Sequence, residues 1–457
     1  MARVLIINLA SLPMPGNEPI FPIGARCVED ALRFAGHFVR LMDFVESPQA
    51  LDDFSWLNDA YDIVAFAIRN IDPIDLSCDG HVLEYARFAE RVHAALDPKQ
   101  TGGSRPLLVA GGPGFSLFAK SLVDLLGVDL GISGPAETIM LEVAADPGAF
   151  LGSGSILQGR RYDGFVERVL THPPALMRAY ANTRNAMIGV ETMRRTCFQK
   201  CIYCPYAHIT GNNSGDYKPL ALMAAEIDAI HGAGFRRIFF TDSIFNSQRA
   251  AKDIACLLGG SDFPDLTWSA YFSPKPFDDA FAGLLAKSGL ETVVISPDSL
   301  DAGMMRNLGK NFDLASVEKF LKRCRAHGLT PMVNIVFGGP GETRETVRNT
   351  ARFINENLRA GELSMHVGYR ILPQTALSAL TGLTEPDLLA PTFYPIEEQI
   401  VQWLIQDLDS RFLTPSVMVN LLAGRAAARR MRKIPATALR GETSDGFSHV
   451  ALSREPA

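Results

Sequence analysis

The 457-residue sequence lacks any continuous apolar run of the roughly 18–20 residues that a membrane-spanning helix needs. It also lacks a cationic start followed by an apolar block, because Met1-Ala-Arg3 leads directly into the strand-like segment Val4–Leu9. The seven cysteines are an odd number, and three of them fall within eight positions, which argues against a secreted disulfide framework. These features predict a cytoplasmic protein with no membrane segment and with a metal or redox site.

An excess of positive charge is also missing, and so are the common nucleotide-binding motifs. The formal net charge is −6, so no basic face for nucleic acid is expected. Neither G-x-G-x-x-G after a first strand nor G-x₄-G-K-[ST] occurs, which disfavours a dinucleotide or nucleoside-triphosphate role. A hydrophobic share of 47% is typical of a globular chain, and the length suits two or three domains.

Residues 1–150 alternate short apolar runs with helical segments. Strands are expected at Val4–Leu9, Val39–Asp43, Ile63–Ile68, Leu107–Ala110 and Gly131–Ser133, with helices at Gly24–Phe34 and Ser116–Leu126. Short buried strands separated by helices predict an α/β, Rossmann-like domain with a parallel sheet. Ligands of such sheets bind at the carboxyl ends of the strands, where the glycines of Gly111–Ser116 would let the backbone approach a large ligand closely.

A second series of strands and helices follows a linker expected at 151–185. Its strands are expected at Met187–Glu191, Arg237–Thr241, Thr267–Phe272, Thr292–Ser296, Met332–Phe337 and Met365–Ile371, with helices between them such as Leu220–Ala233 and Leu314–His327. This pattern predicts an open, partial (β/α)₆ TIM barrel over 186–375, whose chemistry would lie at the carboxyl ends of the strands. A mostly helical region at 376–435 and a flexible tail at 436–457 complete the expected organisation.

Three cysteines, Cys197, Cys201 and Cys204, follow the first expected barrel strand. Three thiolates so close together on a loop can hold three irons of a cubane cluster and leave the fourth iron open for a substrate. A structural zinc site, completed by His208 as a Cys₃His set, is the alternative that the spacing also permits.

The spacing C-x₃-C-x-aromatic-C, with Tyr203 as the aromatic residue, resembles the signature of the radical SAM (S-adenosylmethionine) superfamily. In that family a [4Fe-4S] cluster binds the amino and carboxyl groups of SAM through its fourth iron, and the fold is a partial barrel. Segments resembling the family's second-, fourth-, fifth- and sixth-strand elements follow in order at Phe240–Asn246, Val294–Ser299, Asn334–Thr343 and Tyr369–Thr375. The second- and sixth-strand segments resemble those of the family's cobalamin-carrying subset.

The resemblance implies a set of SAM-binding residues. Asp298 stands where a carboxylate commonly holds the SAM ribose, and Asn334, Gly338 and Gly339 stand in the fifth-strand element that supports adenine and methionine. Arg370 could fork onto a carboxylate at the barrel mouth and, with Tyr203, is expected at the reaction centre. Further candidates for the SAM carboxylate or ribose, each equally well explained as a solvent-exposed residue, are Ser273, Lys275, Arg306 and Lys310.

The first 150 residues resemble the cobalamin (B12)-binding domain that precedes such barrels. The resemblance implies that cobalamin is lined by Gly111, Gly112, Gly114, Gly134 and Glu137, with Arg69 and Asn70 near the lower face of the cobalt. The cobalt-ligating motif D-x-H-x-x-G is incomplete at Asp79–Glu84, so His81 is expected to be a loop residue and not a ligand.

Taken together, the resemblance implies a cobalamin-dependent radical SAM methyltransferase. Such an enzyme makes a 5′-deoxyadenosyl radical, which activates a substrate carbon to receive a methyl group from methylcobalamin. The expected partners are a small biosynthetic intermediate and an external electron donor such as flavodoxin or ferredoxin. Three alternatives remain open: ring formation or rearrangement without net methyl transfer, methylation of a trigonal carbon without the adenosyl radical, and a cobalamin or redox sensor.

Overall fold

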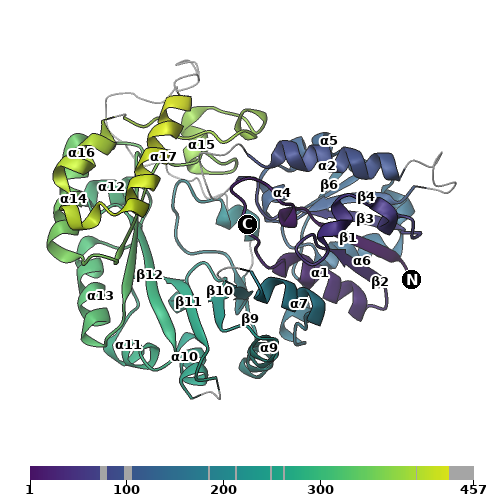
Figure 1. Ribbon diagram of the computed structural model, residues 1–457, viewed down its shortest axis with the longest axis horizontal. Coiled ribbons are helices and arrows are strands. Elements are labelled where there is room, and N and C mark those ends of the chain that lie inside the picture. The colour runs from purple at the N-terminus through teal and green to yellow at the C-terminus, as the bar shows by residue number, and fades with distance from the viewer. Residues whose placement is uncertain are drawn as a thin grey trace, which may run out of the picture.

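The computed structural model describes residues 1–72, 80–96, 105–183, 186–210, 214–247, 250–260, 263–397 and 399–431. The tail predicted at 436–457 lies outside these ranges. Two six-stranded parallel sheets lie side by side and carry most of the helices (Figure 1). This confirms the predicted α/β architecture. In the parts of the chain that the structure describes, no helix is both long and apolar enough to cross a bilayer.

The first sheet has the strand order β2-β1-β3-β4-β5-β6 with every pair parallel. Its strands are β1 (Arg3–Asn8), β2 (Phe38–Met42), β3 (Ile63–Ala67), β4 (Leu107–Gly111), β5 (Leu130–Ser133) and β6 (Ser155–Gln158). The order reverses between β1 and β3, which makes the carboxyl ends of these two strands the place where ligands of doubly wound sheets bind. The loop that begins at Ile68 follows β3 at that point.

Helices cover both faces of the first sheet. The flanking helices are α1 (Ile23–Phe34), α2 (Val82–Ala95), α4 (Pro113–Leu117), α5 (Ala119–Leu126) and α6 (Glu137–Ala145). Val4 and Ile6 of β1 pack in one apolar cluster with α1 and α6, whereas Leu5 and Ile7 pack in another with α2 and α5. The alternation follows from the two-residue period of a strand that is buried on both sides.

Two local features of this domain differ from the sequence prediction. The strand β6 joins the first sheet within the range 151–185 that was expected to be a linker. The helix expected from Ser116 starts earlier, at Pro113, and is interrupted at Phe118, whose φ of −129° is not helical. Proline at the first helical position explains the early start, because its fixed φ suits a helix and its missing N–H is not needed there. After β6 the chain continues through α7 (Pro174–Ala181) toward the second sheet.

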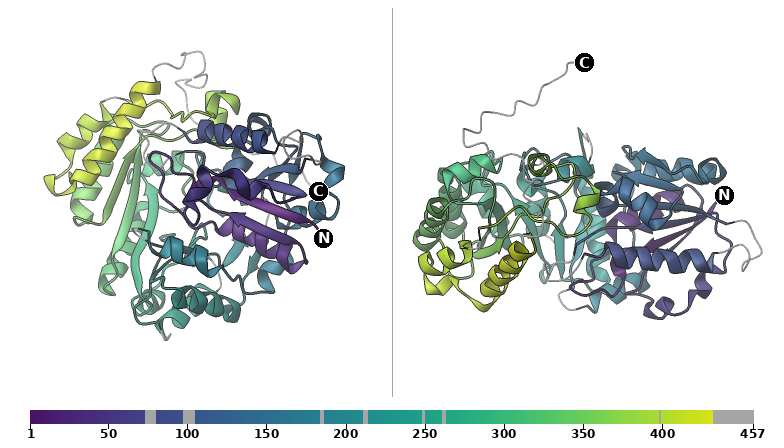
Figure 2. Two further views of the ribbon diagram at one scale, coloured as in Figure 1. Left: turned by 45° about the vertical axis from the view of Figure 1, so that its right-hand side comes forward. Right: turned by 90° about the horizontal axis from the view of Figure 1, so that it is seen from above.

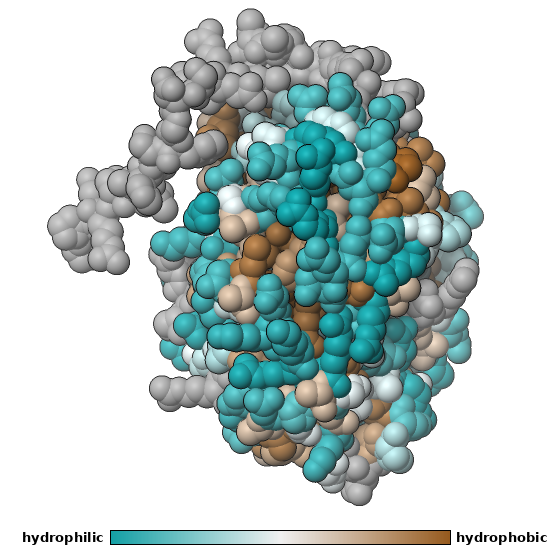
Figure 3. Space-filling view, turned by 90° about the vertical axis from the view of Figure 1, so that its left-hand side faces the viewer, coloured by the Kyte–Doolittle hydropathy of each residue, from teal (hydrophilic) through white to brown (hydrophobic). Residues whose placement is uncertain are grey.

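The second sheet is an open barrel with the strand order β14-β13-β12-β11-β10-β7. Its strands are β7 (Ile188–Val190), β10 (Arg237–Phe240), β11 (Thr267–Phe272), β12 (Leu290–Asp298), β13 (Pro331–Phe337) and β14 (Leu363–Val367). The helices on its outer side are α9 (Leu220–Gly232), α10 (Ala251–Gly259), α11 (Asp279–Leu285), α12 (Ala302–Asn307), α13 (Leu314–Ala326) and α14 (Arg344–Asn357). Figure 3 shows the solvent side of this layer, which is mostly hydrophilic with scattered apolar residues.

Within the described ranges, three α-helices follow the last strand of the barrel. They are α15 (Ala376–Thr381), α16 (Ile400–Asp407) and α17 (Pro415–Met431). The helix α17 packs beside β14, the edge strand, and α16 packs on α14. Covering an edge strand in this way removes a surface on which another chain could pair.

The two sheets are not independent packing units. The apolar cluster on one face of the first sheet continues into Met304, Leu308, Tyr369, Ile371 and Leu377 of the second part of the chain. Figure 2 shows the two domains in contact along one side. The domains are therefore held in a fixed relation by a shared core.

Candidate functional site

The carboxyl ends of the two sheets face each other, because contacts between the domains involve the loops that follow their strands. These contacts join Glu137 to Arg194 (2.6 Å), Asp72 to Arg370 (2.9 Å) and the Ser116 carbonyl to His208 Nε2 (3.1 Å). Ligand sites in both fold types lie at strand carboxyl ends. The two predicted sites therefore lie on either side of one interface.

The three clustered cysteines lie on a loop inserted into a small antiparallel hairpin, β8 (Met193–Arg195) with β9 (Ser214–Tyr217). A short helix, α8 (Tyr206–Thr210), follows the loop. As whole residues, Cys197 and Cys201 are half-buried and Cys204 is exposed. Burial raises the pKa of both Cys201 and Cys204, so a bound cation would be needed to keep them as thiolates.

The arrangement of these thiols bears on the choice between a zinc ion and a cluster. Among the described residues, no three His, Cys, Asp or Glu side chains converge closely enough to hold a single metal ion. His208, the fourth ligand of the zinc alternative, contacts the Ser116 carbonyl instead. A cubane cluster needs no histidine, since three thiolates can each bind one iron and leave the fourth iron open.

A buried carboxylate holds the start of the cysteine loop. Asp242, in the turn after β10, accepts hydrogen bonds from the Thr192 hydroxyl (2.5 Å) and from the Met193 amide (3.0 Å). Burial raises the pKa of Asp242 to about 7. This residue lies inside the predicted second-strand element, but its role in supporting the loop was not predicted.

A compact polar group surrounds Cys201. The ammonium of Lys310 lies 2.5 Å from Asp298 Oδ2, 3.1 Å from the Tyr203 hydroxyl and 3.5 Å from Cys201 Sγ. The Tyr203 hydroxyl donates to the same Asp298 carboxylate. The sequence left Lys310 equally well explained as a SAM contact or as a solvent-exposed residue. In the structure its side chain is only 3% exposed, so the second interpretation is wrong.

Asp298 ends β12 in a conformation that is rare for a residue with a side chain. Its φ is +61°, and the register with β13 shifts between Ile295 and Asp298. Such a conformation is held only where the surroundings fix it, and it often marks a functional site. The predicted role of Asp298 as a ribose contact stays a prediction, because Lys310 and Tyr203 already contact its carboxylate.

The concave side of the barrel is accessible, whereas its convex side is packed. On β11, Trp268, Ala270 and Phe272 are buried against the outer helices, while Tyr271 is 42% exposed on the opposite face. Asn334 of β13 also lies on the concave face and donates to Ser296 Oγ at 3.2 Å. The barrel interior is therefore lined by polar and aromatic side chains that a small molecule could contact.

The other predicted SAM residues lie around this concave face. Ser273 is buried just after β11, where its backbone amide and carbonyl both bond to the Asn246 side chain.

Gly338 follows β13 with a φ of +91°, and a Cβ at Gly339 would lie 3.1 Å from Leu308 and Tyr369. Both glycines are thus explained by conformation or packing. The Glu342 carboxylate holds this turn by accepting from the Gly338 amide at 3.2 Å. Of the remaining candidates, Lys275 and Arg306 are exposed.

In the first domain, two of the predicted glycines bring two loops together. A Cβ on Gly112 would lie 2.5 Å from the Ile68 carbonyl oxygen, and one on Gly114 would lie 3.0 Å from that of Arg69. The Gly114 amide donates to the Ile68 carbonyl at 3.0 Å. Glycine at 112 and 114 therefore fixes the loop that carries Arg69 at the carboxyl end of β3.

Arg69 lies at the point where strand order reverses. Its side chain is exposed and bonds to the Asn70 side chain at 2.9 Å. Desolvation by the surrounding protein lowers the pKa of Arg69, while Tyr85 acts in the opposite direction. The hydroxyl of Tyr85 donates to the Asn70 carbonyl at 2.9 Å and so supports this loop.

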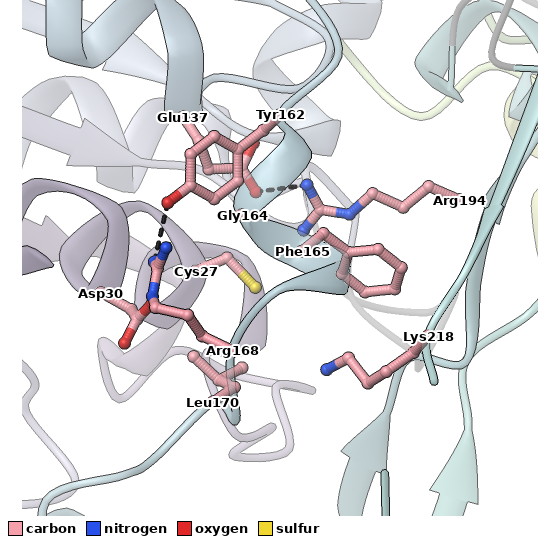
Figure 4. A pocket seen from close by; sticks show the side chains of 10 residues that line it. All are labelled: Cys27, Asp30, Glu137, Tyr162, Gly164, Phe165, Arg168, Leu170, Arg194 and Lys218. Atoms are coloured by element: carbon pink, nitrogen blue, oxygen red, sulfur yellow. Dashed lines mark hydrogen bonds and ion pairs between the residues drawn. The ribbon is translucent and has the colours of Figure 1, made fainter. Parts of the chain in front are cut away.

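Glu137 is engaged in an ion pair with the other domain. Figure 4 shows it in a small pocket, paired with Arg194 beside Phe165 and Cys27. Its side chain is only 5% exposed. The role of Glu137 in binding a cofactor therefore stays a prediction. Gly134 precedes it with a φ of +92°, and Gly111 ends β4 against the Ile132 carbonyl.

Two further predicted residues have structural partners. Arg370 bonds to the Asp72 carboxylate and also donates to the carbonyls of Leu388 (2.6 Å) and Ile371 (2.7 Å). As predicted for this residue type, the guanidinium contacts a carboxylate through two nitrogens. The carboxylate belongs to Asp72 of the protein and not to a ligand. His81 is 2% exposed, packs edge-on against Tyr85 and immediately precedes α2, so the predicted loop histidine is a buried one.

Comparison with known proteins was consistent with this geometry. The family model of the Radical SAM superfamily matches residues 192–354, which include the cysteine loop and most of the barrel. Tryptophan 2-C-methyltransferase from Streptomyces laurentii is 26% identical, over 82% of this chain and 74% of its own length.

Two solved structures share the fold over most of the chain. TsrM from Kitasatospora setae, a radical S-adenosylmethionine methyltransferase solved with tryptophan and a SAM analogue, is 23% identical with a TM-score of 0.69, covering 84% of this chain and 77% of its own. The cobalamin-dependent enzyme OxsB, solved with aqua-cobalamin, is 13% identical with a TM-score of 0.64, covering 89% of this chain and 56% of its own.

Proposed function

Because the chain belongs to the radical SAM enzymes, with cobalamin-dependent, methyltransferase-like members as its relatives, we propose that it methylates a carbon centre of a small biosynthetic intermediate. Its cofactors are a [4Fe-4S] cluster, SAM and cobalamin. This proposal rests on the contact between the carboxyl ends of the two sheets, where ligands of both fold types bind. The helix α8, which follows the cysteine loop, contacts α4, which follows β4 of the first sheet, through His208 and the Ser116 carbonyl.

Cys197, Cys201 and Cys204 would hold the cluster. Their loop is fixed from both sides, since the Ile202 amide donates to the Leu308 carbonyl (3.2 Å) and the Ile202 carbonyl accepts from the Leu377 amide (2.8 Å). This support keeps the thiols together at the barrel mouth without using them in the packing of the core.

SAM and the substrate would lie on the concave face of the barrel. Asn334 and Tyr271 offer polar groups there, and Phe239 packs edge-on against Tyr271 with ring centroids 5.9 Å apart. An aromatic wall suits a flat substrate, which gains stacking energy without requiring a charge in the barrel. Tryptophan, the substrate in the TsrM structure, is for this reason the first compound to test.

Cobalamin would lie at the carboxyl end of the first sheet, against the turn of Gly112 and Gly114. Arg69, an exposed residue, would face it from the loop after β3. Arg69 would present a guanidinium, which has no lone pair for a metal, to this side of the cofactor. When bound, the three cofactors supply one-electron reduction of SAM and the methyl group, while the chain positions them and excludes water.

The test is an anaerobic assay of reconstituted protein with cobalamin, SAM, tryptophan and a chemical reductant or flavodoxin as electron donor. Product mass and 5′-deoxyadenosine are measured by chromatography with mass spectrometry. A substrate gain of one methyl group, lost when Cys197, Cys201 and Cys204 are replaced by alanine, supports the proposal. The matched control replaces Cys27, Cys256 and Cys324, which lie outside the triad.

The same assay separates the alternatives. Release of 5′-deoxyadenosine without methyl gain indicates a rearrangement or ring-forming enzyme, and methyl gain without 5′-deoxyadenosine indicates transfer to a trigonal carbon. If neither product forms with tryptophan or related indoles and amino acids, methyl transfer to this substrate class is contradicted.

A further inference from the structure

Lys310 is placed against the cysteine loop by the backbone. Gly309 has a φ of +78°, and a Cβ there would lie 2.2 Å from the Lys200 carbonyl oxygen. The adjacent Leu308 carbonyl accepts from the Ile202 amide. Only glycine at 309 permits this close crossing, and the crossing directs the next residue, Lys310, toward Cys201.

The charge of Lys310 is buried and is paired with the buried charge of Asp298. Its side chain is 3% exposed and that of Asp298 is 4% exposed, so water screens neither group strongly. The Asp298 carboxylate accepts one hydrogen bond from the ammonium, and the Tyr203 hydroxyl accepts another. The third close contact of the ammonium is Cys201 Sγ at 3.5 Å, within reach of an N–H···S hydrogen bond.

Such a contact has a defined effect on an iron–sulfur centre. A reduced cluster carries one more negative charge than its oxidised form, so a nearby cation and a hydrogen bond to a ligand sulfur favour reduction. A nearby carboxylate has the opposite effect. The pair therefore places two opposing charges beside one ligand of the expected cluster.

We propose that Lys310 raises the reduction potential of a cluster held by the triad, through Cys201, and that Asp298 sets the size of this effect. Tyr203 is a positioning residue that holds Asp298 in place. The inference rests on the proposed function only in that the triad binds a [4Fe-4S] cluster; it is independent of cobalamin and of the substrate.

The test is a redox titration of the anaerobically reconstituted full chain, followed by electron paramagnetic resonance of the reduced cluster. Lys310→Met is expected to lower the midpoint potential, so that the reduced-to-oxidised ratio at a fixed potential falls about tenfold, equivalent to about 59 mV for one electron. Asp298→Asn is expected to raise it. The double variant should lie between the two, and Lys310→Arg should restore most of the wild-type value.

Lys252→Met is the matched control, because Lys252 forms an ion pair with Asp278 on the surface, where both side chains are more than half exposed. It should leave the potential unchanged. Wild-type protein with no cluster signal would contradict the proposed function itself. A full cluster with unchanged potentials in Lys310→Met and Asp298→Asn would overturn this inference alone. If Lys310→Met assembles no cluster, Asp298→Asn decides, and an unchanged or lowered potential in that variant counts against the inference.

Discussion

Arg370 and Asp72 form an ion pair, 2.9 Å from Nε to Oδ2, across 298 positions of sequence. The pair joins the end of the barrel to the loop after β3 of the first sheet. Its side chains are 12% and 19% exposed, so it is largely sheltered from solvent. This contact helps to fix the position of the two predicted cofactor sites relative to each other.

Breaking the pair should therefore loosen the domains. Arg370→Ala leaves the carbonyls of Leu388 and Ile371 without this donor, and we expect a loss of roughly 1–3 kcal/mol in the free energy of unfolding. Thermal or urea unfolding of the apoprotein measures it. The control is Arg87→Ala, which removes an exposed pair with Glu84 and should cost less than about 1 kcal/mol.

A double-mutant cycle separates this role from binding of a ligand carboxylate. If Arg370 acts through Asp72, Asp72→Asn should add little to Arg370→Ala, and the coupling free energy should be about 0.5–3 kcal/mol. Fully additive effects on unfolding, with SAM affinity reduced by Arg370→Ala alone, would favour the ligand-binding role predicted from the sequence.

His208 should be dispensable for metal binding. Its Nε2 contacts the Ser116 carbonyl, so His208→Ala should remove an interdomain hydrogen bond and keep the iron and sulfide content of the wild type. Metal analysis after anaerobic reconstitution checks this. Loss of metal in His208→Ala, to the extent seen in Cys201→Ala, would instead favour the Cys₃His zinc site.

Glycine at 309 should be required for the cysteine loop. Gly309→Ala introduces a Cβ close to the Lys200 carbonyl in addition to a strained positive φ, and we expect reduced iron content with lower thermal stability. Gly328→Ala is the matched control, because its φ is +72° and nothing lies within 4 Å of the added Cβ. Equal effects of the two substitutions on iron content would show that the close crossing is unimportant.

Asp242 should make stability depend on pH. Burial raises its pKa from 3.8 to about 7 in the folded chain, so between these values the folded state holds a proton that the unfolded state has lost. Stability due to this group is therefore full below about pH 4 and falls as pH rises toward 7, with each pKa unit worth about 1.4 kcal/mol. Asp242→Asn should remove this component, so its stability relative to wild type should be higher at pH 8 than at pH 5. A pH-independent difference between the two proteins would contradict the assignment.

The fold could largely be predicted because its strands are short apolar runs bounded by helices. The strand Thr267–Phe272 was predicted with the bounds that the structure has. The strand β6 was missed because Ser155-Ile-Leu-Gln158 has only two apolar residues and lies at a sheet edge, where burial is partial.

The site was predicted less completely, because its contacts join residues far apart in sequence. The triad and Asp298 follow from local motifs. The pairing of Arg370 with Asp72, and of Lys310 with Cys201, depends on how strands and domains pack, which no local pattern contains. A lysine directly after a glycine in a turn was the only signal for Lys310, and that pattern is equally typical of exposed turns.

The most direct test of the account is metal analysis with electron paramagnetic resonance on anaerobically reconstituted protein. Reconstituted protein should contain about four irons and four sulfides per chain and show a reduced-cluster signal that SAM alters and that Cys201→Ala abolishes. Colourless protein with stoichiometric zinc at the three thiols, and no such signal after reduction, would contradict it.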